Sequence, residues 1–340
     1  MGWESLSNRS TRSLTTVPWL TVSLTGSCNS RCTGCDYWLP GKHATPLTRD
    51  LWEPLVDSLV RLQVRSIAIT GGEPTLAPDL LEFLDAINER KKSLRVVLLS
   101  NGMLLRKIAE KIVFLVDEVV LSLDGPNAEV HDEVRGLPCF HLLGPTVAAL
   151  KQYRPELPVY ARSTVCRANC RYVDDTALAA VKLGFWGISF LAADTTTGSA
   201  FARDSATGPR NNVMQVPVGS ALWDLKRAVE SLQSLRNNML PPGFLRDSPE
   251  TLQRIVDLFC AAVGYGSVSA PRCNAPWVSA FVEANGDVKP CFFHPAVGNL
   301  HEQPFEQIVR GPKLAAFLDG LDIQRDPTCR RCVCWLHLDV

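Results

Sequence analysis

The sequence predicts an α/β protein: an open, partial (β/α)6 barrel followed by a small C-terminal domain with a β-hairpin. Short apolar runs alternate with amphipathic runs over the first two-thirds of the chain, a pattern typical of parallel strands joined by crossover helices. Six such strand–helix units are too few for a closed eight-stranded barrel. Near the C-terminus, Asn285-Gly286 separates two strand-like runs, which is a strong hairpin signal.

The predicted strands of the barrel are short apolar runs. In chain order they are Leu20–Thr25, Ser66–Thr70, Arg95–Ser100, Glu118–Leu123, Val159–Val165 and Gly187–Ala192. The predicted helices between them carry apolar residues at helical spacing. They cover Leu51–Leu62, Leu80–Arg90, Leu104–Ile112, Gly144–Lys151 and Asp174–Leu183.

The last third of the chain follows a different pattern. The segment Thr195–Gln215 is rich in Gly, Ser, Thr and Asn, which predicts a loop or boundary. Helical patterns follow over Ala221–Arg236 and Pro249–Ala262, and the hairpin strands over Val278–Ala284 and Asp287–Phe293. The expected division is an N-terminal extension (1–17), the barrel (18–194), a linker and helical segment (195–265) and a C-terminal domain (266–340).

Composition limits the classes of function. The 340 residues include 35 basic and 35 acidic side chains, and this neutral balance gives no electrostatic case for nucleic acid or an anionic membrane. No apolar stretch approaches the ~18 residues of a membrane span, and the polar N-terminus has no signal-peptide core. Without a secretion signal, the 12 cysteines are more typical of metal binding or catalysis than of disulfides, so we expect a cytoplasmic protein.

Polar or glycine-rich segments follow four of the predicted strands directly. Because function in barrels of parallel strands gathers on the loops after the strands' carboxyl ends, these segments predict one convergent site. In chain order they are Cys28 to Cys35, Gly71-Gly72-Glu73-Pro74, Ser100-Asn101-Gly102 and Ser122-Leu123-Asp124-Gly125.

Cys28, Cys32 and Cys35 form a C-x3-C-x2-C run directly after the first strand. Thiolates are the usual ligands of iron–sulfur clusters, and three of them leave one iron of a cubane cluster open to a small ligand. A structural zinc site favours four ligands, and His43 could complete one. The spacing therefore favours an iron–sulfur cluster and leaves zinc as the alternative.

In this order the motifs resemble those of the radical S-adenosylmethionine superfamily. The resemblance covers roughly residues 20–192 and includes His131-Asp132 and Arg135-Gly136. It implies that the three cysteines ligate a 4Fe–4S cluster whose open iron is chelated by S-adenosylmethionine. It also implies that an electron from the cluster cleaves this cofactor to a 5′-deoxyadenosyl radical, which abstracts a substrate hydrogen.

The resemblance further implies which residues bind S-adenosylmethionine. Glu73 and its two glycines would receive the methionine amino group, and Ser122 and Arg135 would hold the carboxylate and ribose. The full implied set is Gly71, Gly72, Glu73, Ser100, Asn101, Ser122, Asp124 and Arg135. Taken singly, Glu73, Asn101 or Ser122 could instead serve only as a helix cap or turn residue.

Five cysteines near the C-terminus resemble the ligands of a SPASM or twitch auxiliary-cluster domain. Cys273 and Cys291 flank the hairpin turn, and the chain ends in a Cys-Arg-Arg-Cys-Val-Cys run. A full SPASM domain needs further cysteines, so the twitch form with one auxiliary 4Fe–4S cluster is the closer resemblance. The implied ligands are Cys273, Cys291, Cys329 and Cys332, with Cys334 able to replace Cys332. A four-cysteine zinc ribbon is the alternative.

The other four cysteines are Cys139, Cys166, Cys170 and Cys260. Buried free cysteines behave as small apolar residues, so we expect all four to pack in the core. Cys260 is in addition a conceivable hydrogen donor to a substrate radical.

The resemblance implies an enzyme with a flavodoxin or ferredoxin-type electron donor. Only 27 residues precede Cys28, too few for an added peptide-recognition domain, and the full SPASM set is absent. Both observations favour a small polar substrate, such as a sugar, aminocyclitol or nucleoside, that is dehydrogenated, epimerised or decarboxylated in natural-product or antibiotic biosynthesis. The alternatives are a peptide-modifying maturase of the ribosomal-peptide or sulfatase type and a non-catalytic metal-binding protein.

Overall fold

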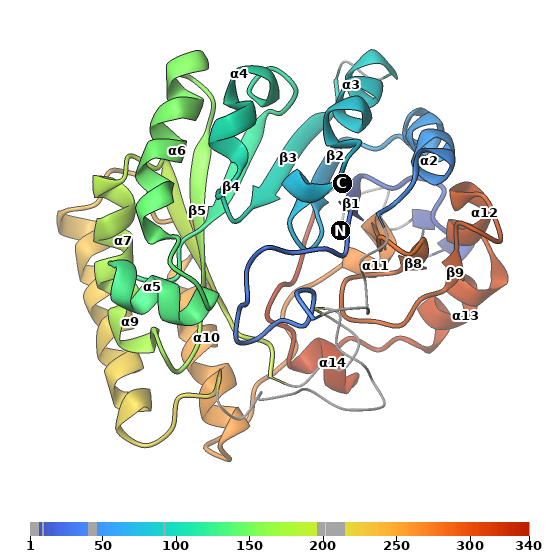
Figure 1. Cartoon of the computed structure of the whole chain (residues 1–340). Coiled ribbons are helices and arrows are strands. Elements are labelled where there is room, and N and C mark those ends of the chain that lie inside the picture. Colours follow the sequence, from blue (N-terminus) through green and yellow to red (C-terminus); the bar gives the residue numbers. More distant parts are fainter. Residues whose placement is uncertain are drawn as a thin grey trace.

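A computed structural model describes residues 7–8, 10–39, 46–90, 93–195, 201 and 215–339. These residues form one twisted sheet with helices packed against it (Figure 1). The strands are β1 (Trp19–Ser23), β2 (Ser66–Thr70), β3 (Arg95–Ser100), β4 (Glu118–Ser122), β5 (Val159–Val165), β6 (Gly187–Ala192), β7 (Ser279–Val282), β8 (Asp287–Lys289) and β9 (Gly298–Asn299).

The helices alternate with the strands of the barrel and then follow one another toward the C-terminus. The α-helices are α2 (Arg49–Arg61), α3 (Leu80–Arg90), α4 (Ala109–Ile112), α5 (Ala128–Arg135), α6 (Phe140–Tyr153), α7 (Val173–Lys182), α9 (Ser220–Asn238), α10 (Pro249–Ala262), α11 (Ala275–Val278), α12 (Phe305–Val309), α13 (Pro312–Gly320) and α14 (Pro327–Arg330). Short 3-10 helices are η1 (Pro74–Leu76), η2 (Leu105–Ile108) and η3 (Cys170–Tyr172).

The first six strands form the predicted open barrel. Each of β1 to β5 pairs in parallel with the next strand in the chain, so that Leu20 lies opposite Ile67 and Val97 opposite Glu118. The sheet does not close, because β1 pairs with β7 rather than with β6. The predicted partial (β/α)6 barrel is therefore confirmed, and the carboxyl ends of its strands all lie at one end.

The predicted hairpin is confirmed and has a further role. Strand β7 pairs with β8 in antiparallel register around Asn285-Gly286, and Gly286 adopts a φ of 85°, which glycine allows without strain. The same β7 pairs in parallel with β1. The C-terminal domain thus continues the barrel sheet, and its hairpin is held directly beside the strand that leads into Cys28.

The sheet buries two apolar clusters, one on each face. The large one lies between the sheet and the helices and includes Leu20, Ile67 and Ile69. A small separate cluster contains Ala68 and Val97, which alternate with those residues along their strands and therefore face the other side. This second face is the interior of the partial barrel.

Some elements differ from the prediction. The predicted helix Leu104–Ile112 is a 3-10 turn (η2) followed by the short α4, because apolar spacing alone does not separate the two helix types. Helix α5 was not predicted, since its eight residues expose most of their polar side chains and bury only Val130, His131 and Val134.

Most of the predicted loop Thr195–Gln215 lies outside the described residues, as does His43. Helices α9 and α10 follow it, and α9 packs against η3 and α7 while α10 packs against β6. Between them, Leu245 forms a parallel bridge with Ile188 and extends the sheet beyond β6. Among the described helices, none combines the length and apolar character that a bilayer crossing requires.

Candidate functional site

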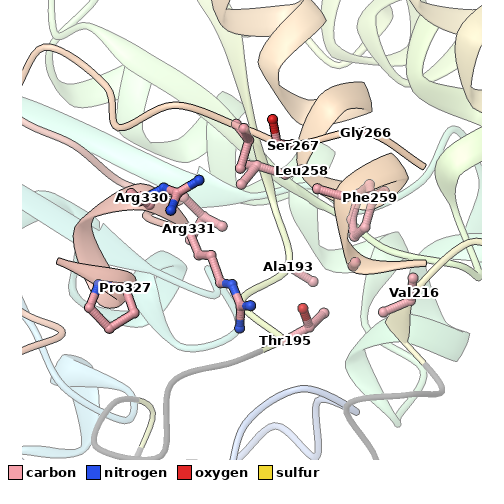
Figure 2. A pocket seen from close by; sticks show the side chains of 14 residues that line it. Ala193, Thr195, Val216, Leu258, Phe259, Gly266, Ser267, Pro327, Arg330 and Arg331 are labelled. Carbon is pink, nitrogen blue, oxygen red and sulfur yellow. The ribbon is translucent and has the colours of Figure 1, made fainter. Parts of the chain in front are cut away.

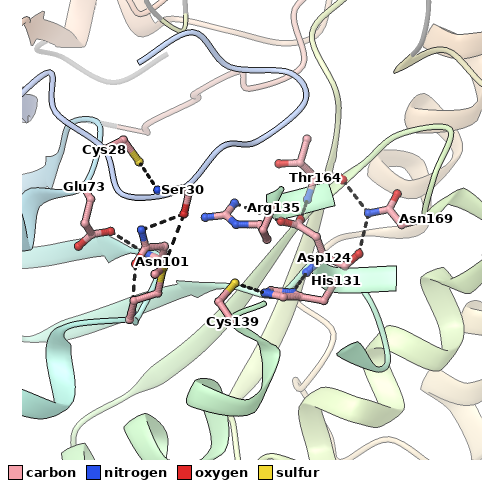
Figure 3. A network of polar contacts seen from close by, with 11 residues as sticks. Cys28, Ser30, Glu73, Asn101, Asp124, His131, Arg135, Cys139, Thr164 and Asn169 are labelled. Atoms are coloured by element: carbon pink, nitrogen blue, oxygen red, sulfur yellow. Dashed lines mark hydrogen bonds and ion pairs between the residues drawn. The ribbon is translucent and has the colours of Figure 1, made fainter. Parts of the chain in front are cut away.

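The three cysteines of the C-x3-C-x2-C run lie on the loop after β1, here called the cysteine loop (residues 26–38). Figure 3 shows Cys28 and Ser30 of this loop facing residues that follow β2, β3 and β4. All four predicted strand-end segments therefore meet, as the sequence predicted. The contacts below explain how each one holds the loop.

The segment after β2 supports the start of the cysteine loop through its backbone. The amide of Gly72 donates to the carbonyl of Thr25 (2.7 Å), and the amide of Glu73 donates to the carbonyl of Ser27 (2.8 Å). A Cβ on Gly72 would lie 2.2 Å from the Ser27 carbonyl oxygen, a distance that no side chain tolerates. A glycine is therefore required here so that the two backbone segments can approach.

We expect Gly72→Ala to destabilise the protein by about 1–3 kcal/mol, the usual range for inserting a methyl group into packed structure. Because the displaced atoms belong to Ser27, directly before Cys28, the variant should also bind less iron. Urea unfolding and iron analysis measure both effects. Gly320→Ala is the control, because nothing lies within 4 Å of its added methyl group. Equal decreases in the free energy of unfolding and in iron content for Gly72→Ala and Gly320→Ala would contradict this account of Gly72.

Glu73 is a connecting residue between β2 and β3. Its side chain is 1% exposed, and its Oε1 accepts hydrogen bonds from Thr75 and from the Ser100 hydroxyl (2.8 Å), while Oε2 accepts from the amide of Asn101 (2.8 Å). The sequence interpretation gave Glu73 to the amino group of S-adenosylmethionine. Oε1 is engaged within the protein, where Glu73 also caps η1, whereas Oε2 accepts a single hydrogen bond. Binding of the cofactor's amino group by Glu73 therefore stays a prediction.

Asn101 connects the end of β3 to the cysteine loop. Its side-chain amide donates to Asn29 Oδ1 (2.8 Å) and to the hydroxyl of Ser30 (3.1 Å), and its Oδ1 accepts from the amide of Met103. The residue is 6% exposed. All polar atoms of this side chain are thus engaged in positioning the loop.

The C-terminal end of α5 holds the middle of the cysteine loop. The carbonyls of Arg135 and Val134 accept hydrogen bonds from the amides of Arg31 (2.9 Å) and Thr33 (3.2 Å). Gly136 ends the helix with a φ of 73° and allows this close contact. The helix that carries Arg135 is therefore fixed against the loop that carries Cys32.

Arg135 and Asp124 form a buried ion pair beside the cysteines. Arg135 Nη1 lies 3.2 Å from Asp124 Oδ2, and Asp124 Oδ1 accepts from the amide of Thr164 (2.7 Å). Burial acts to lower the pKa of Arg135, but the neighbouring Cys32 and Asp124 raise it further, so the guanidinium stays charged. In Figure 3 this guanidinium points toward the cysteine loop.

The Nε atom of Arg135 is buried and has no hydrogen-bond partner among the described residues. A buried donor without a partner costs about 1–3 kcal/mol, which a bound anionic group would recover. Ser122, which ends β4, is half-buried and carries a hydroxyl group. The two side chains suit an anionic ligand beside the cysteines.

His131 stabilises this arrangement and was given no role by the sequence. Its Nδ1 accepts from the amide of Asp124 (3.0 Å), so Nε2 carries the proton and lies 3.4 Å from Cys139 Sγ. Burial lowers the pKa of His131 to about 4, which keeps the ring neutral. The His131-Asp132 motif was the feature of the sequence that could have pointed to a role for His131.

The thiols of the cysteine loop are protonated when free. Burial raises the pKa of Cys28 to about 11 and that of Cys35 to about 12, and it also raises the pKa of Cys32. Each value is raised further by a neighbouring thiol or carboxylate, so the groups are close enough to interact. A metal cluster bound here would therefore displace three protons.

A second group of thiols lies in the C-terminal domain. One cavity of about 40 Å³ is lined by all five cysteines that the sequence placed together: Cys273, Cys291, Cys329, Cys332 and Cys334. His294 also lines it, with Nε2 3.4 Å from Cys329 Sγ, and this side chain is 5% exposed. Sequence reasoning missed His294, although it lies three residues after Cys291.

Two contacts tie this second group to the barrel. Arg254 on α10 donates to the carbonyls of Arg330 (3.0 Å) and Ser269 (2.7 Å), which fixes the segment that carries the last cysteines. The hydroxyl of Tyr37, in the cysteine loop, donates to Glu283 (2.9 Å), which also pairs with Lys289 of β8 (2.8 Å). The two cysteine groups are therefore parts of one connected structure.

The remaining four cysteines belong to neither group, although Cys139 lies beside His131 and close enough to Arg135 and Cys32 to interact with them. Cys139, Cys166 and Cys170 are buried in the core, as predicted. Cys260 on α10 is partly buried against the core. None of the twelve cysteines, all of which belong to the described residues, forms a disulfide.

A cavity of about 490 Å³ opens between the end of β6, helix α10 and the segment 327–333. Figure 2 shows Ala193 and Thr195, just after β6, at this cavity with Phe259 of α10 and Arg331. Cys260 is absent from the part of its lining that the structure describes. This cavity brings together the barrel and the segment that carries Cys329 and Cys332.

Comparison with protein families gives two matches. Residues 22–141 match the radical SAM superfamily, and residues 273–333 match the SPASM family, described as an iron–sulfur cluster-binding domain. The first match contains the cysteine loop and Arg135. The second contains Cys273, Cys291, Cys329 and Cys332.

Individual proteins match across both regions. The chain is 28% identical to the AdoMet-dependent heme synthase of Methanosarcina barkeri, over 84% of this chain and 80% of that protein. It is 24% identical to AlbA, the subtilosin biosynthesis protein of Bacillus subtilis, over 86% of this chain and 59% of that protein. The fold is similar to that of Streptococcus suis SuiB bound to its precursor peptide SuiA, with a TM-score of 0.68, 15% identity, and coverage of 94% and 70% of the two chains.

Proposed function

Because this chain belongs to the radical S-adenosylmethionine superfamily and carries a C-terminal domain of the SPASM type, we propose that it is an enzyme that modifies a peptide. Its cofactors are a radical 4Fe–4S cluster, S-adenosylmethionine and an auxiliary iron–sulfur cluster. When bound, these supply a reductively generated radical that takes a hydrogen atom from the substrate. A reductant is required, and we propose a flavodoxin or ferredoxin in that role.

The residues present fit this set of cofactors. Cys28, Cys32 and Cys35 would hold the radical cluster, since they are the three soft donors on one loop, and hydrogen bonds from the segments after β2 and β3 and from the end of α5 hold that loop. The unpartnered Arg135 Nε and the Ser122 hydroxyl would hold anionic or hydroxyl groups of S-adenosylmethionine. Glu73, Asn101 and Asp124 would position the loop and Arg135.

The auxiliary cluster would be held by cysteines that line the small C-terminal cavity. Thiolates are the ligands that iron–sulfur clusters prefer, and five are present where four are needed: Cys273, Cys291, Cys329, Cys332 and Cys334. The role of the chain's own residues is then to fix the distance between the two clusters. Arg254 and the Tyr37–Glu283 contact do this, because they join the C-terminal domain to α10 and to the cysteine loop.

The observation that carries the peptide proposal is the match to AlbA across both the barrel and the C-terminal domain. AlbA takes part in the biosynthesis of a bacteriocin. The sequence favoured a sugar, aminocyclitol or nucleoside instead, and the relatives reported above do not support that class. The open cavity of about 490 Å³ beside Cys329 and Cys332 is compatible with one or two residues of a peptide chain.

The match to the heme synthase supports a second candidate, a tetrapyrrole substrate. The alignment with that relative spans 84% of this chain and 80% of the relative at 28% identity. Both candidates share the hydrogen-abstraction step, so the cluster and cofactor assignments do not decide between them.

The experiment that tests the proposal measures which compounds stimulate cleavage of S-adenosylmethionine. Cell extract is separated by size into a peptide fraction and a small-molecule fraction, and each is added anaerobically to the reconstituted enzyme with dithionite. We expect the peptide fraction to raise the rate of 5′-deoxyadenosine formation, and protease treatment to abolish the increase. Stimulation by the small-molecule fraction or by porphyrins alone would overturn the peptide proposal.

We expect Arg135→Gln to weaken the binding of S-adenosylmethionine by about 1.5–3 kcal/mol, the usual contribution of a charge-assisted hydrogen bond. This corresponds to roughly a tenfold to hundredfold higher Kd. Equilibrium binding to the reconstituted protein measures it, with iron content determined for each variant. Arg135→Lys keeps the positive charge but lacks the guanidinium Nε, so its affinity for S-adenosylmethionine should lie between those of the unaltered enzyme and Arg135→Gln. An unchanged Kd with intact iron content would remove Arg135 from the binding site.

A further inference from the structure

We propose that the cavity between α10 and the segment 327–333 is a carboxylate-binding site and that Arg330 and Arg331 hold an acidic side chain of the substrate peptide. The inference rests on the proposed function only in assigning the carboxylate to a peptide. The structure itself gives the cavity, its positive charge and its position beside the auxiliary cysteines, and these do not depend on the proposed function.

The charged side chains in the described lining of the cavity are all of one sign. Arg330 and Arg331 are the only charged residues in the part of its lining that the structure describes, and both are basic. The chain as a whole has zero formal net charge, so this local excess is not a consequence of a basic protein. A partly enclosed cavity with two positive charges attracts an anion because its walls reduce the screening by water.

The two guanidinium groups are available for a ligand. Both arginines are exposed, and neither forms an ion pair with an acidic side chain among the described residues. They contrast with Arg310, which pairs with Glu306, and Arg272, which pairs with Asp339. Guanidinium groups bind carboxylates through two parallel hydrogen bonds, so carboxylate is the ligand chemistry that this pair favours.

The backbone that carries the pair is fixed. Arg254 of α10 donates to the carbonyls of Arg330 and Cys332, and its guanidinium lies 5.2 Å from the ring centre of Trp335. The backbone that carries the two arginines therefore does not need to be ordered when a ligand binds, which lowers the entropic cost of binding. Figure 2 shows them on one side of the cavity and Phe259 with Val216 on the opposite side.

The opposite wall is apolar and determines what can accompany the carboxylate. Leu258, Phe259 and Val216 are buried residues that line the cavity away from the arginine-bearing segment. A ligand that fills the cavity therefore carries a carboxylate next to apolar groups, as an acidic residue beside a hydrophobic one does in a peptide. Because Arg330 and Arg331 lie between Cys329 and Cys332, the bound segment would lie next to the auxiliary cluster.

The test uses fluorescein-labelled peptides and the reconstituted holoenzyme. One peptide alternates Glu and Leu, and its matched partner alternates Gln and Leu. Fluorescence anisotropy should give a Kd about tenfold lower for the Glu peptide, the effect expected of one to two charge-assisted contacts at an exposed site. In Arg330→Gln/Arg331→Gln this difference should disappear, and in Arg330→Lys/Arg331→Lys most of it should remain.

Arg325→Gln is the matched control, because Arg325 is an exposed arginine shortly before the segment 327–333 and lies outside the described lining of the cavity. It should keep the full preference for the Glu peptide. Iron content is measured for every variant, and the lysine variant keeps the test valid if the glutamine variant binds less iron. A preference that survives in the glutamine variant overturns the proposal, and equal affinity for the two peptides overturns the assignment of the site to an acidic side chain of a peptide.

A second arm separates this inference from the proposed function. Protoporphyrin IX carries carboxylates on a tetrapyrrole, and its dimethyl ester does not. If Arg330 and Arg331 are required for tight binding of the free acid while the Glu peptide is not preferred, the carboxylate site is retained and the peptide substrate is rejected. If only the Glu peptide shows the arginine-dependent preference, both the site and the peptide assignment are supported.

Discussion

Replacing any one of Cys28, Cys32 and Cys35 with alanine is expected to abolish cleavage of S-adenosylmethionine. The cysteine loop supplies three thiols to a site that needs three protein ligands, so no neighbouring cysteine substitutes for a lost one. The fixed backbone of the loop, held by Gly72, Asn101 and α5, prevents a rearrangement that would recruit another donor. The formation of 5′-deoxyadenosine under anaerobic reducing conditions measures the effect.

Cys260→Ala is the matched control for these three variants, since Cys260 lies on α10 outside both cysteine groups. It should cleave S-adenosylmethionine at the rate of the unaltered enzyme. The three variants should also fold. Cys28 Sγ accepts a hydrogen bond from the Ser30 amide, but the contacts that hold the loop to the segments after β2 and β3 and to α5 use backbone groups and the Asn101 side chain. Circular dichroism checks this. Undiminished cleavage by any of the three would place the radical cluster elsewhere.

The double variant Cys291→Ala/Cys329→Ala is expected to stop product formation while cleavage of S-adenosylmethionine continues. Five cysteines line the C-terminal cavity, so removing two leaves three, one fewer than a fully cysteine-ligated cluster requires. The radical site is untouched, because its ligands lie on a different loop. Iron content should fall from about eight to about four atoms per chain, the difference of one 4Fe–4S cluster.

The same double variant separates iron from zinc at the C-terminal site. If the site holds zinc, iron content stays the same and one zinc ion is lost instead. Single replacement of Cys334 or Cys332 shows which of the two completes the set, since the unneeded thiol can be lost without loss of iron. Product formation by the double variant at the normal rate would contradict a role of the auxiliary cluster in turnover.

The barrel was predictable from the sequence because its strands are apolar runs with polar ends. The bounds of β2, β3, β5 and β6 agree with the prediction, and the four strand-end segments converge as expected for parallel strands. The pairing of β7 with β1 was not predictable. Both strands are short apolar runs, and nothing in their local pattern identifies the partner across more than 250 residues.

The site was predictable in its residue types but less so in its contacts. Cysteine spacing identified both thiol groups. The roles of Glu73 and Asn101 depend on which atoms their side chains contact. The sequence around Glu73 would be the same whether its carboxylate caps η1 and binds Ser100 or binds a cofactor. His294, Arg254 and the Arg330–Arg331 pair have no motif of their own, because their importance arises from tertiary contacts alone.

The measurement that tests the central claim most directly is transfer of deuterium from a peptide to 5′-deoxyadenosine. Cells are grown with perdeuterated amino acids, and their peptide fraction is incubated anaerobically with the reconstituted enzyme, S-adenosylmethionine and reductant. The account predicts that mass spectrometry finds deuterium in 5′-deoxyadenosine, and that the Cys28→Ala variant forms none of this product. Unlabelled 5′-deoxyadenosine from the peptide fraction, together with label transferred from a deuterated small-molecule fraction, would contradict it.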